Sequence, residues 1–287
     1  MKRAIKENIT RIIGIILIII GIIAFNYISW LALAFFIPAI IMILANKKLA
    51  QAEFRQFILT FKKIPEKKYF LITLYDTLSW FGLFFATYAI GTLMARQTEK
   101  IMPGIMMGGP GGIAALLAMT VAYFAVLLLV SVIIYSAFKG LIWLTILDKK
   151  IEWRYFTKFS LLNAIWFALW IIPALVIAIG LKPAYFLPVV IAAAIIDIHL
   201  TAVMQYSFTK KQFIFSSLGN TFKTGFGKIK QFLLPYSYMA VVYMILLNIF
   251  WVIPKAQNIL TFAMILILMF YMAWYRQYMA VLLGKIT

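Results

Sequence analysis

The stretch "GIAALLAMTVAYFAVLLLVSVIIYSA", from Gly112 to Ala137, contains no charged residue and is long enough to cross a lipid bilayer as a helix. Similar runs recur along the chain, in which 65% of the 287 residues are hydrophobic and 12% are charged. This composition lies far outside the range of soluble domains, because one soluble core could not bury so many long apolar runs. The sequence therefore predicts an all-α integral membrane protein, a polytopic bundle of transmembrane helices.

The apolar runs and the polar segments between them predict eight spans. The first two are near the minimum length for a span, and only Phe25 to Tyr27 separate them. The predicted spans are Thr10 to Phe25, Ile28 to Ala45, Tyr69 to Met94, Gly112 to Ala137, Phe159 to Leu181, Phe186 to Phe208, Phe232 to Ile253 and Ile259 to Ala280. We interpret the chain as one membrane domain, 1–287, with a leading hairpin and three units that each join an interfacial segment to a hairpin (1–45, 46–137, 138–208 and 209–287).

Lysine and arginine are divided very unequally between the two sets of connecting segments. Of the 27 basic residues, one set holds only Arg96, Lys100, Lys182 and Lys255. An excess of Lys and Arg marks the cytoplasmic side of a membrane protein. We therefore expect the other set, together with both chain termini, to be cytoplasmic, and we expect the protein in the plasma membrane of a prokaryote.

Three segments on the predicted cytoplasmic side combine basic and aromatic residues. In "AEFRQFILTFKKIPEKK" (Ala52 to Lys68), Phe54, Phe57 and Phe61 recur at helical spacing, and "QFIFSSLGNTFKTGFGKIKQFLL" (Gln212 to Leu234) carries a similar stripe. The third segment, "LDKKIEWRYFTKF" (Leu147 to Phe159), is less regular. The patterns fit amphipathic helices lying in the inner membrane interface. They fit equally well connectors that pack on the bundle, and the two interpretations are compatible.

The formal charge of +19 does not indicate nucleic-acid binding, because the basic residues lie between apolar runs rather than on one polar domain. The predicted partners are membrane lipids with anionic head groups. The basic side chains expected to face those head groups are Lys62, Lys63, Lys67, Lys68, Lys149, Lys150, Lys210, Lys211, Lys223, Lys228 and Lys230.

Two segments carry a resemblance to a known group of proteins. They are "YFTKFSLLNAIWFALWIIP" (Tyr155 to Pro173) and "SSLGNTFKTGFGKIKQFLLPYSYMAVVYMIL" (Ser216 to Leu246), each a basic entry followed by a hairpin rich in Trp or Tyr. The chain here resembles prokaryotic polytopic membrane proteins that include the membrane domain accompanying glycerophosphoryl diester phosphodiesterases. The resemblance covers the last two units and includes no catalytic motif, so it implies a membrane fold and no hydrolase activity.

The segment "AAAIIDIHLTAV" (Ala192 to Val203) places Asp197 and the chain's one histidine, His199, inside an apolar run. Residues two apart on a helix point in nearly opposite directions, so we expect these two side chains to have different partners. Asp197 shares a face with Thr201 and Gln205, and this stripe must meet protein or water because a charge near the bilayer centre is costly. It is either a proton or cation site or a polar contact between helices, and the second interpretation is favoured.

Three other polar residues lie inside predicted spans and could contribute to such a site. Asp76 is close to the cytoplasmic end of its span, whereas Asn163 and Asn248 are candidate neighbours of Asp197. For Asp76 a structural role is again favoured.

The segment "MARQTEKIMPGIMMGGPGG" (Met94 to Gly112) is rich in glycine and methionine, and we expect a flexible connector or a re-entrant lid there. Its thioethers could bind Cu(I), but no His or Cys lies near them, so we predict no metal and no cofactor. With one histidine and no cysteine in the chain, zinc-hydrolase and thiol chemistry are excluded, and we predict that the protein is not an enzyme.

Two classes of function remain. The first is a non-enzymatic membrane protein that organises lipid or partner proteins through its basic cytoplasmic face. The alternative is a small permease or ion-coupled transporter that uses Asp197. A membrane-embedded enzyme is the least favoured class.

Overall fold

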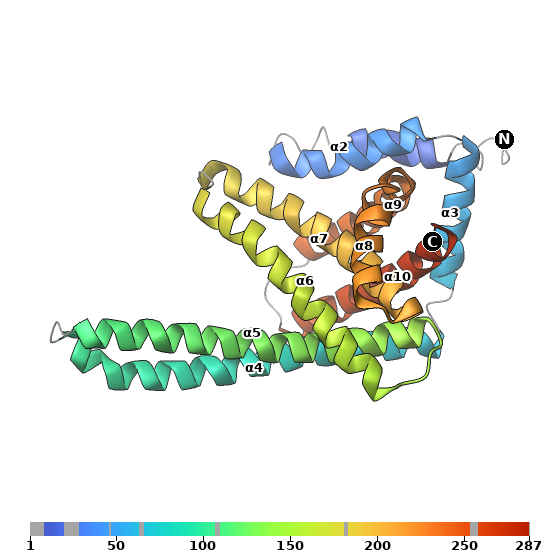
Figure 1. The fold of residues 1–287 in the computed structure, drawn as a ribbon. Coiled ribbons are helices and arrows are strands. Elements are labelled where there is room, and N and C mark those ends of the chain that lie inside the picture. The colour runs from blue at the N-terminus through green and yellow to red at the C-terminus, as the bar shows by residue number, and fades with distance from the viewer. Residues whose placement is uncertain are drawn as a thin grey trace. The chain divides into compact units, whose positions relative to one another are not determined.

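The computed structural model describes residues 9–19, 29–45, 47–62, 66–106, 110–180, 183–252 and 258–286 (Figure 1), and these residues contain helices and no strand. The helices that follow the short helix Ile9–Ile19 are α2 (Ser29–Leu44), α3 (Lys47–Lys62), α4 (Lys67–Met106), α5 (Pro110–Ile146), α6 (Trp153–Gly180), α7 (Pro183–Lys211), α8 (Ile214–Gly225), α9 (Ile229–Val252) and α10 (Asn258–Ile286). The predicted all-α fold is confirmed. Helices are expected because the bilayer core offers no water to the backbone, and a helix satisfies its own N–H and C=O groups.

Six helices of the described part are long and apolar enough to cross a membrane, and the chain is therefore a multi-pass membrane protein. They correspond to the last six predicted spans, and they are Lys67–Pro103, Gly111–Ile146, Trp153–Ala174, Val189–Lys211, Ile229–Leu246 and Met264–Ile286. The two remaining predictions, Thr10 to Phe25 and Ile28 to Ala45, overlap the shorter apolar helix Ile9–Ile19 and the 16-residue α2. Residues 20–28 lie outside the described part, so the leading hairpin as a pair of spans stays a prediction.

The expected flexible connector after Met94 is wrong for residues 95–106, which continue α4 as a helix. Arg, Gln, Glu and Lys favour helix, so the helix runs on past the point where the apolar pattern stops. Pro110 then occupies the first position of α5, which suits proline because that N–H has no helical partner. Residues 107–109 of the predicted connector lie outside the description. Figure 1 shows α4 and α5 running side by side as a long hairpin.

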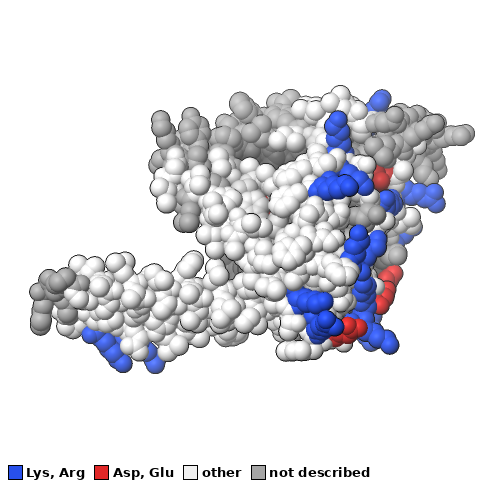
Figure 2. All heavy atoms as spheres, viewed as in Figure 1, with Lys and Arg blue, Asp and Glu red and all other residues white. Residues whose placement is uncertain are grey.

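Charged side chains gather at separate places along the α4–α5 hairpin, with a white, uncharged stretch between them (Figure 2). On α4 no charged residue occurs from Thr77 to Ala95. At the helical rise this stretch is about 28 Å long, close to the hydrocarbon thickness of about 30 Å. Helix α4 therefore has the dimensions of a membrane span with a polar extension beyond it.

The chain divides into two compact units. Unit 1 contains residues 1–73, 199–206 and 218–287, and unit 2 contains residues 74–198 and 207–217. Helix α7 contributes to both, since its central residues 199–206 belong to unit 1 and its two ends to unit 2. The division into a leading hairpin and three sequence units stays a prediction.

Unit 1 is centred on aromatic side chains from α3, α9 and α10. Phe57 of α3 is 8% exposed, and its ring lies edge-on to Trp274 and Tyr278 of α10, at centroid distances of 5.3 and 6.0 Å. Phe61 stacks on Trp274 at 4.4 Å, and Tyr238 of α9 lies 5.2 Å from Phe57. The amphipathic helix predicted here thus packs its aromatic face on the protein, in agreement with the connector interpretation of this segment.

In unit 2, a local close approach joins the hairpin helices at Gly82, and aromatic packing fixes the start of α6. A Cβ added at Gly82 of α4 would lie 3.1 Å from Ile134 of α5, so glycine lets the two helices approach closely. At the start of α6, Tyr155 stacks on Phe159 and contacts Phe208 of α7, with centroids 5.3 and 5.6 Å away. These contacts fix the helices that carry the polar residues described next.

Candidate functional site: an intramembrane polar network

Asp76 of α4 forms a buried ion pair with Lys139 of α5. The ammonium Nζ donates a hydrogen bond of 2.5 Å to Oδ1 of the carboxylate, and both side chains are buried. The same ammonium lies 5.6 Å from the centre of the Tyr135 ring, within the range of a cation–π interaction. Each charge therefore has a neutralising partner inside the hairpin.

A second polar contact joins α5 to α6. Asn163 Nδ2 donates to Ser136 Oγ at 3.1 Å and to the Phe159 carbonyl of its own helix at 3.0 Å. Ser136 and Asn163 are both buried, and Ser136 precedes Lys139 by three residues on the same face of α5. The α4–α5 and α5–α6 contacts are therefore about one helical turn apart.

A third contact joins α6 to α7 and involves Asp197, the residue singled out from the sequence. The indole N–H of Trp166 donates to Asp197 Oδ1 at 3.0 Å. Trp166 is buried and follows Asn163 by three residues, while Asp197 is half-buried. A carboxylate that accepts a hydrogen bond from an indole N–H inside a span is one of the polar contacts by which membrane helices associate.

The six residues Asp76, Lys139, Ser136, Asn163, Trp166 and Asp197, which we call the polar network, link α4, α5, α6 and α7 within unit 2. Its two carboxylates bond to different donors on different helices. This arrangement differs from the close carboxylate pair of acid–base hydrolases. Its evident chemical effect is to satisfy polar groups that would otherwise face lipid.

The remaining predicted site residues do not all join the polar network. Thr201 and Gln205 follow Asp197 on α7 at intervals of four residues, and both belong to unit 1, where Gln205 is buried. Asn248 lies on α9, in a stretch whose side chains fall outside the description. Asp76, Asn163 and Asp197 are therefore the predicted residues that form polar contacts between neighbouring helices of unit 2, each in a separate pair.

His199 has partners different from those of Asp197, as helical geometry predicts. Its Nδ1 lies 2.5 Å from the Tyr236 hydroxyl and its Nε2 lies 3.0 Å from the Gly225 carbonyl oxygen. The ring also packs edge-on against Phe232 of α9, with centroids 4.7 Å apart. A Cβ at Gly225 would lie 2.5 Å from Leu200 Cδ2, so glycine lets the end of α8 approach α7 without displacing that side chain. The histidine thus joins α7, α8 and α9 in unit 1.

The basic residues predicted to face lipid fall into two groups. Lys149 donates to the carbonyls of Thr209 and Lys210, and Lys228 donates to the carbonyl of Ile286, so these two ammonium groups bind the C-terminal ends of α7 and α10. Cations are favoured there because the last carbonyls carry a partial negative charge. Among the others, Lys62, Lys67, Lys150, Lys210, Lys211, Lys223 and Lys230 are exposed, Lys68 is half-buried, and Lys63 lies outside the description.

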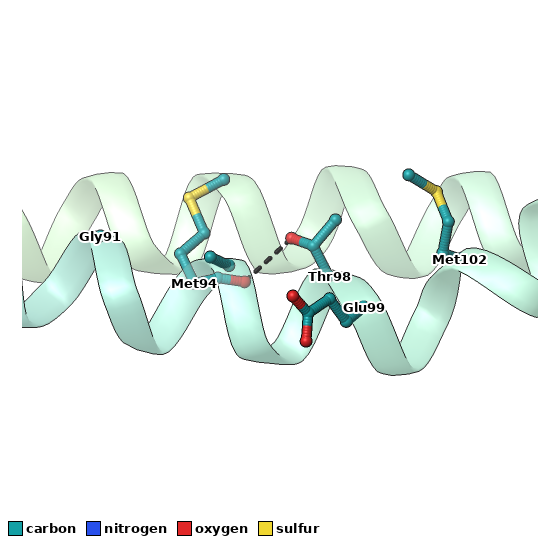
Figure 3. Close-up of a pocket in the computed structure, with 6 residues that line it drawn as sticks. Gly91, Met94, Thr98, Glu99 and Met102 are labelled. Atoms are coloured by element: carbon teal, nitrogen blue, oxygen red, sulfur yellow. Dashed lines mark hydrogen bonds between the residues drawn. The ribbon is translucent and has the colours of Figure 1, made fainter.

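A shallow hollow of about 630 Å³ lies along α4, where Figure 3 shows Met94, Thr98, Glu99 and Met102. Thr98 Oγ1 donates to the Met94 carbonyl at 2.9 Å. Met94 and Met102 are eight residues apart, about 12 Å along the helix. In the part of the chain that the structure describes, no group of three His, Cys, Asp or Glu side chains is placed to hold a metal.

Comparisons with known protein families, with characterised proteins and with solved structures found none that matches this chain. The resemblance to the phosphodiesterase-associated membrane domain accordingly stays a prediction.

Sequence reasoning missed Lys139 and Trp166. Lys139 was assigned to a cytoplasmic connection, because the span was ended at Ala137 just before the charge. The apolar residues that follow Lys139 up to Leu147 are the signal that the helix continues past it.

Proposed function

We propose that this chain is a non-enzymatic polytopic membrane protein that organises lipid or partner proteins through a basic cytoplasmic face. The proposal includes eight spans, both termini in the cytoplasm and a prokaryotic plasma membrane. It is supported by the six apolar helices and by the unequal division of Lys and Arg along the sequence.

The observation that carries the proposal is the concentration of exposed basic residues at one end of unit 2. The connection from α5 to α6, the start of α6 and the end of α7 carry Lys150, Arg154, Lys210 and Lys211, all of them exposed. By contrast, each charged side chain of the polar network is bonded to another residue of the protein. These exposed charges therefore lie at helix ends, whereas the charged side chains of the polar network are buried or half-buried within helices.

The test is lipid enrichment around the full-length protein in nanodiscs of mixed phosphatidylcholine and phosphatidylglycerol, measured by mass spectrometry of the retained lipid. We expect phosphatidylglycerol to be enriched, and we expect replacement of the four basic residues by Gln to remove most of that enrichment. The matched control is Arg96→Gln with Lys100→Gln, which removes two exposed charges from the other end of unit 2. Enrichment that is absent, or that falls equally in both variants, would contradict the proposal.

The alternative function, a small permease or ion-coupled transporter, is favoured by one observation. Asp197 is half-buried although it lies within a span, which leaves part of this carboxylate side chain accessible. The test is proton flux into proteoliposomes for the parent protein and for Asp197→Asn. Flux that is present in the parent and lost in the variant would replace the first proposal with this one.

A further inference from the structure

Two helix ends of unit 2 have a fixed backbone. After α5, Asp148 adopts a left-handed φ of 52°, and Lys149 N–H donates to the Leu144 carbonyl at 2.9 Å. After α7, Gln212 adopts a φ of 59° and donates to the Phe208 carbonyl at 2.6 Å. These are two common ways in which an α-helix ends, and each directs the following residues away from the helix axis.

The two helix ends are also tied to each other. The Lys149 ammonium donates to the carbonyls of Thr209 and Lys210, at 2.6 and 2.9 Å. The Tyr155 hydroxyl shares a buried hydrogen bond of 2.8 Å with Thr209 Oγ1. The segment between α5 and α6 is thereby held against the end of α7, so that residues 150–154 and 210–215 extend from one fixed junction, and we describe them together as one surface.

That surface exposes large apolar side chains. Ile151 is 67% exposed, Trp153 82%, Phe213 68% and Phe215 82%. The corresponding aromatic residue of α3, Phe57, is 8% exposed because it packs on α9 and α10. These four side chains of unit 2 are thus uncovered, whereas Phe57 is covered by protein.

The same surface is net positive, since the exposed Lys150, Arg154, Lys210 and Lys211 outnumber the exposed Asp148 and Glu152 beside them in the sequence. It also lies at the ends of three apolar helices that can span the membrane, α5, α6 and α7. Tryptophan and phenylalanine beside lysine at the end of a span are typical of the lipid head-group region, where the ring enters the acyl boundary and the ammonium meets phosphate.

We propose that these eight residues, which we call the anchoring surface, insert into the anionic head-group layer of the inner leaflet. The aromatic side chains enter the acyl boundary, and the four basic side chains bind the phosphates of phosphatidylglycerol-type lipids. This inference rests on the proposed function and deepens it, because it names the lipid contacts of the basic face and adds an apolar component to them.

The test uses the absence of cysteine from the chain. Phe215→Cys and, separately, Trp153→Cys are labelled with an environment-sensitive fluorophore in the full-length protein. The proteins are placed in nanodiscs with or without phosphatidylglycerol, and quenching by lipids that carry a shallow nitroxide is measured. Lys100→Cys, an exposed position at the far end of the α4–α5 hairpin, is the matched control.

We expect blue-shifted emission at both test positions and about twofold stronger quenching when anionic lipid is present, with little quenching at the control. Adding the four Gln substitutions to Phe215→Cys should reduce quenching to its value without anionic lipid. A label that stays in water with both lipid compositions would overturn the inference and would indicate that the surface binds a soluble protein instead. Equal quenching with and without anionic lipid would also overturn it.

The enrichment measurement separates this inference from the proposed function. Enrichment without quenching at Phe215→Cys and Trp153→Cys means that the basic face binds anionic lipid while the anchoring surface does not insert. Absence of both means that the proposed function fails as well.

Discussion

In unit 1, α3 packs Phe57 and Phe61 against Trp274 of α10, whereas in unit 2 the helices meet at Asp76–Lys139, Ser136–Asn163 and Trp166–Asp197. The α3 contact of unit 1 is thus aromatic, whereas these contacts of unit 2 are polar, although each unit also contains contacts of the other kind. The two kinds of contact differ in the side chains exposed around them. Helix α3 is amphipathic, with exposed polar residues, while the hairpin of unit 2 presents apolar side chains along its length.

A surface helix gains free energy when its apolar face leaves water, so α3 needs only a complementary aromatic face. Helices within lipid gain little from burying apolar surface, because lipid tails are as apolar as leucine. Close packing and polar contacts must then determine which helices pair. The polar network determines the pairing of α4 to α7. Substituting aromatic residues of unit 1 and polar residues of unit 2 therefore measures the two kinds of contact separately.

The largest effect is expected for Trp274→Ala. Removing this buried indole from between Phe57 and Phe61 should lower the free energy of unfolding of unit 1 by about 4 kcal/mol. Hydrogen exchange should show loss of protection in α3 with unchanged protection in the α4–α5 hairpin. The matched control is Trp80→Ala on α4, which removes a 60% exposed indole and should change little. Equal losses in both variants would mean that burial of the ring is not what matters.

Asp76→Asn should lower the stability of unit 2 by about 3 kcal/mol, because it leaves the Lys139 charge buried without its counter-ion. The double variant Asp76→Leu with Lys139→Met should recover most of that loss, since both charges are removed together. Unfolding in mixed micelles with increasing sodium dodecyl sulfate measures both. A double variant as unstable as the single one would show that the ion pair is not the origin of the effect.

A smaller effect is expected at the α5–α6 contact. Asn163→Leu should cost about 1 kcal/mol, in the range of polar contacts between helices in membranes. Ser136→Ala in the Asn163→Leu background should add almost nothing, because the bond is already lost. Additive losses in this double-mutant cycle would refute the contact.

The smallest effect is expected at the end of α7. Lys149→Gln should lower stability by about 0.5 kcal/mol, because the carbonyls of Thr209 and Lys210 lose a cationic donor at a helix C-terminus. Its neighbour Lys150 is exposed, so Lys150→Gln should leave the unfolding midpoint unchanged. A larger loss of stability in Lys150→Gln than in Lys149→Gln would show that the hydrogen bonds of Lys149 are not what stabilises this helix end.

The all-α fold and the class of integral membrane protein could be predicted from the sequence, because long uncharged runs leave few alternative structures. The partner of α3's aromatic face could not, since the same stripe suits lipid and protein. The pairing of Lys139 with Asp76 could not be predicted because the two residues are 63 positions apart, and spacing on one helix cannot reveal a contact with another. The length of α4 was underestimated because hydropathy falls at Arg96 while helix propensity does not.

The α4–α5 hairpin has a further consequence in its unequal apolar lengths. On α5 the uncharged stretch runs from Pro110 to Phe138, about 43 Å, against about 28 Å from Thr77 to Ala95 on α4. In a thicker bilayer, α5 can remain fully matched, while α4 must tilt, thin the lipid around it or draw Arg96 toward the acyl chains. In a thicker bilayer the energetic cost of hydrophobic mismatch therefore falls on α4, whereas in a core of about 30 Å it falls on the longer α5.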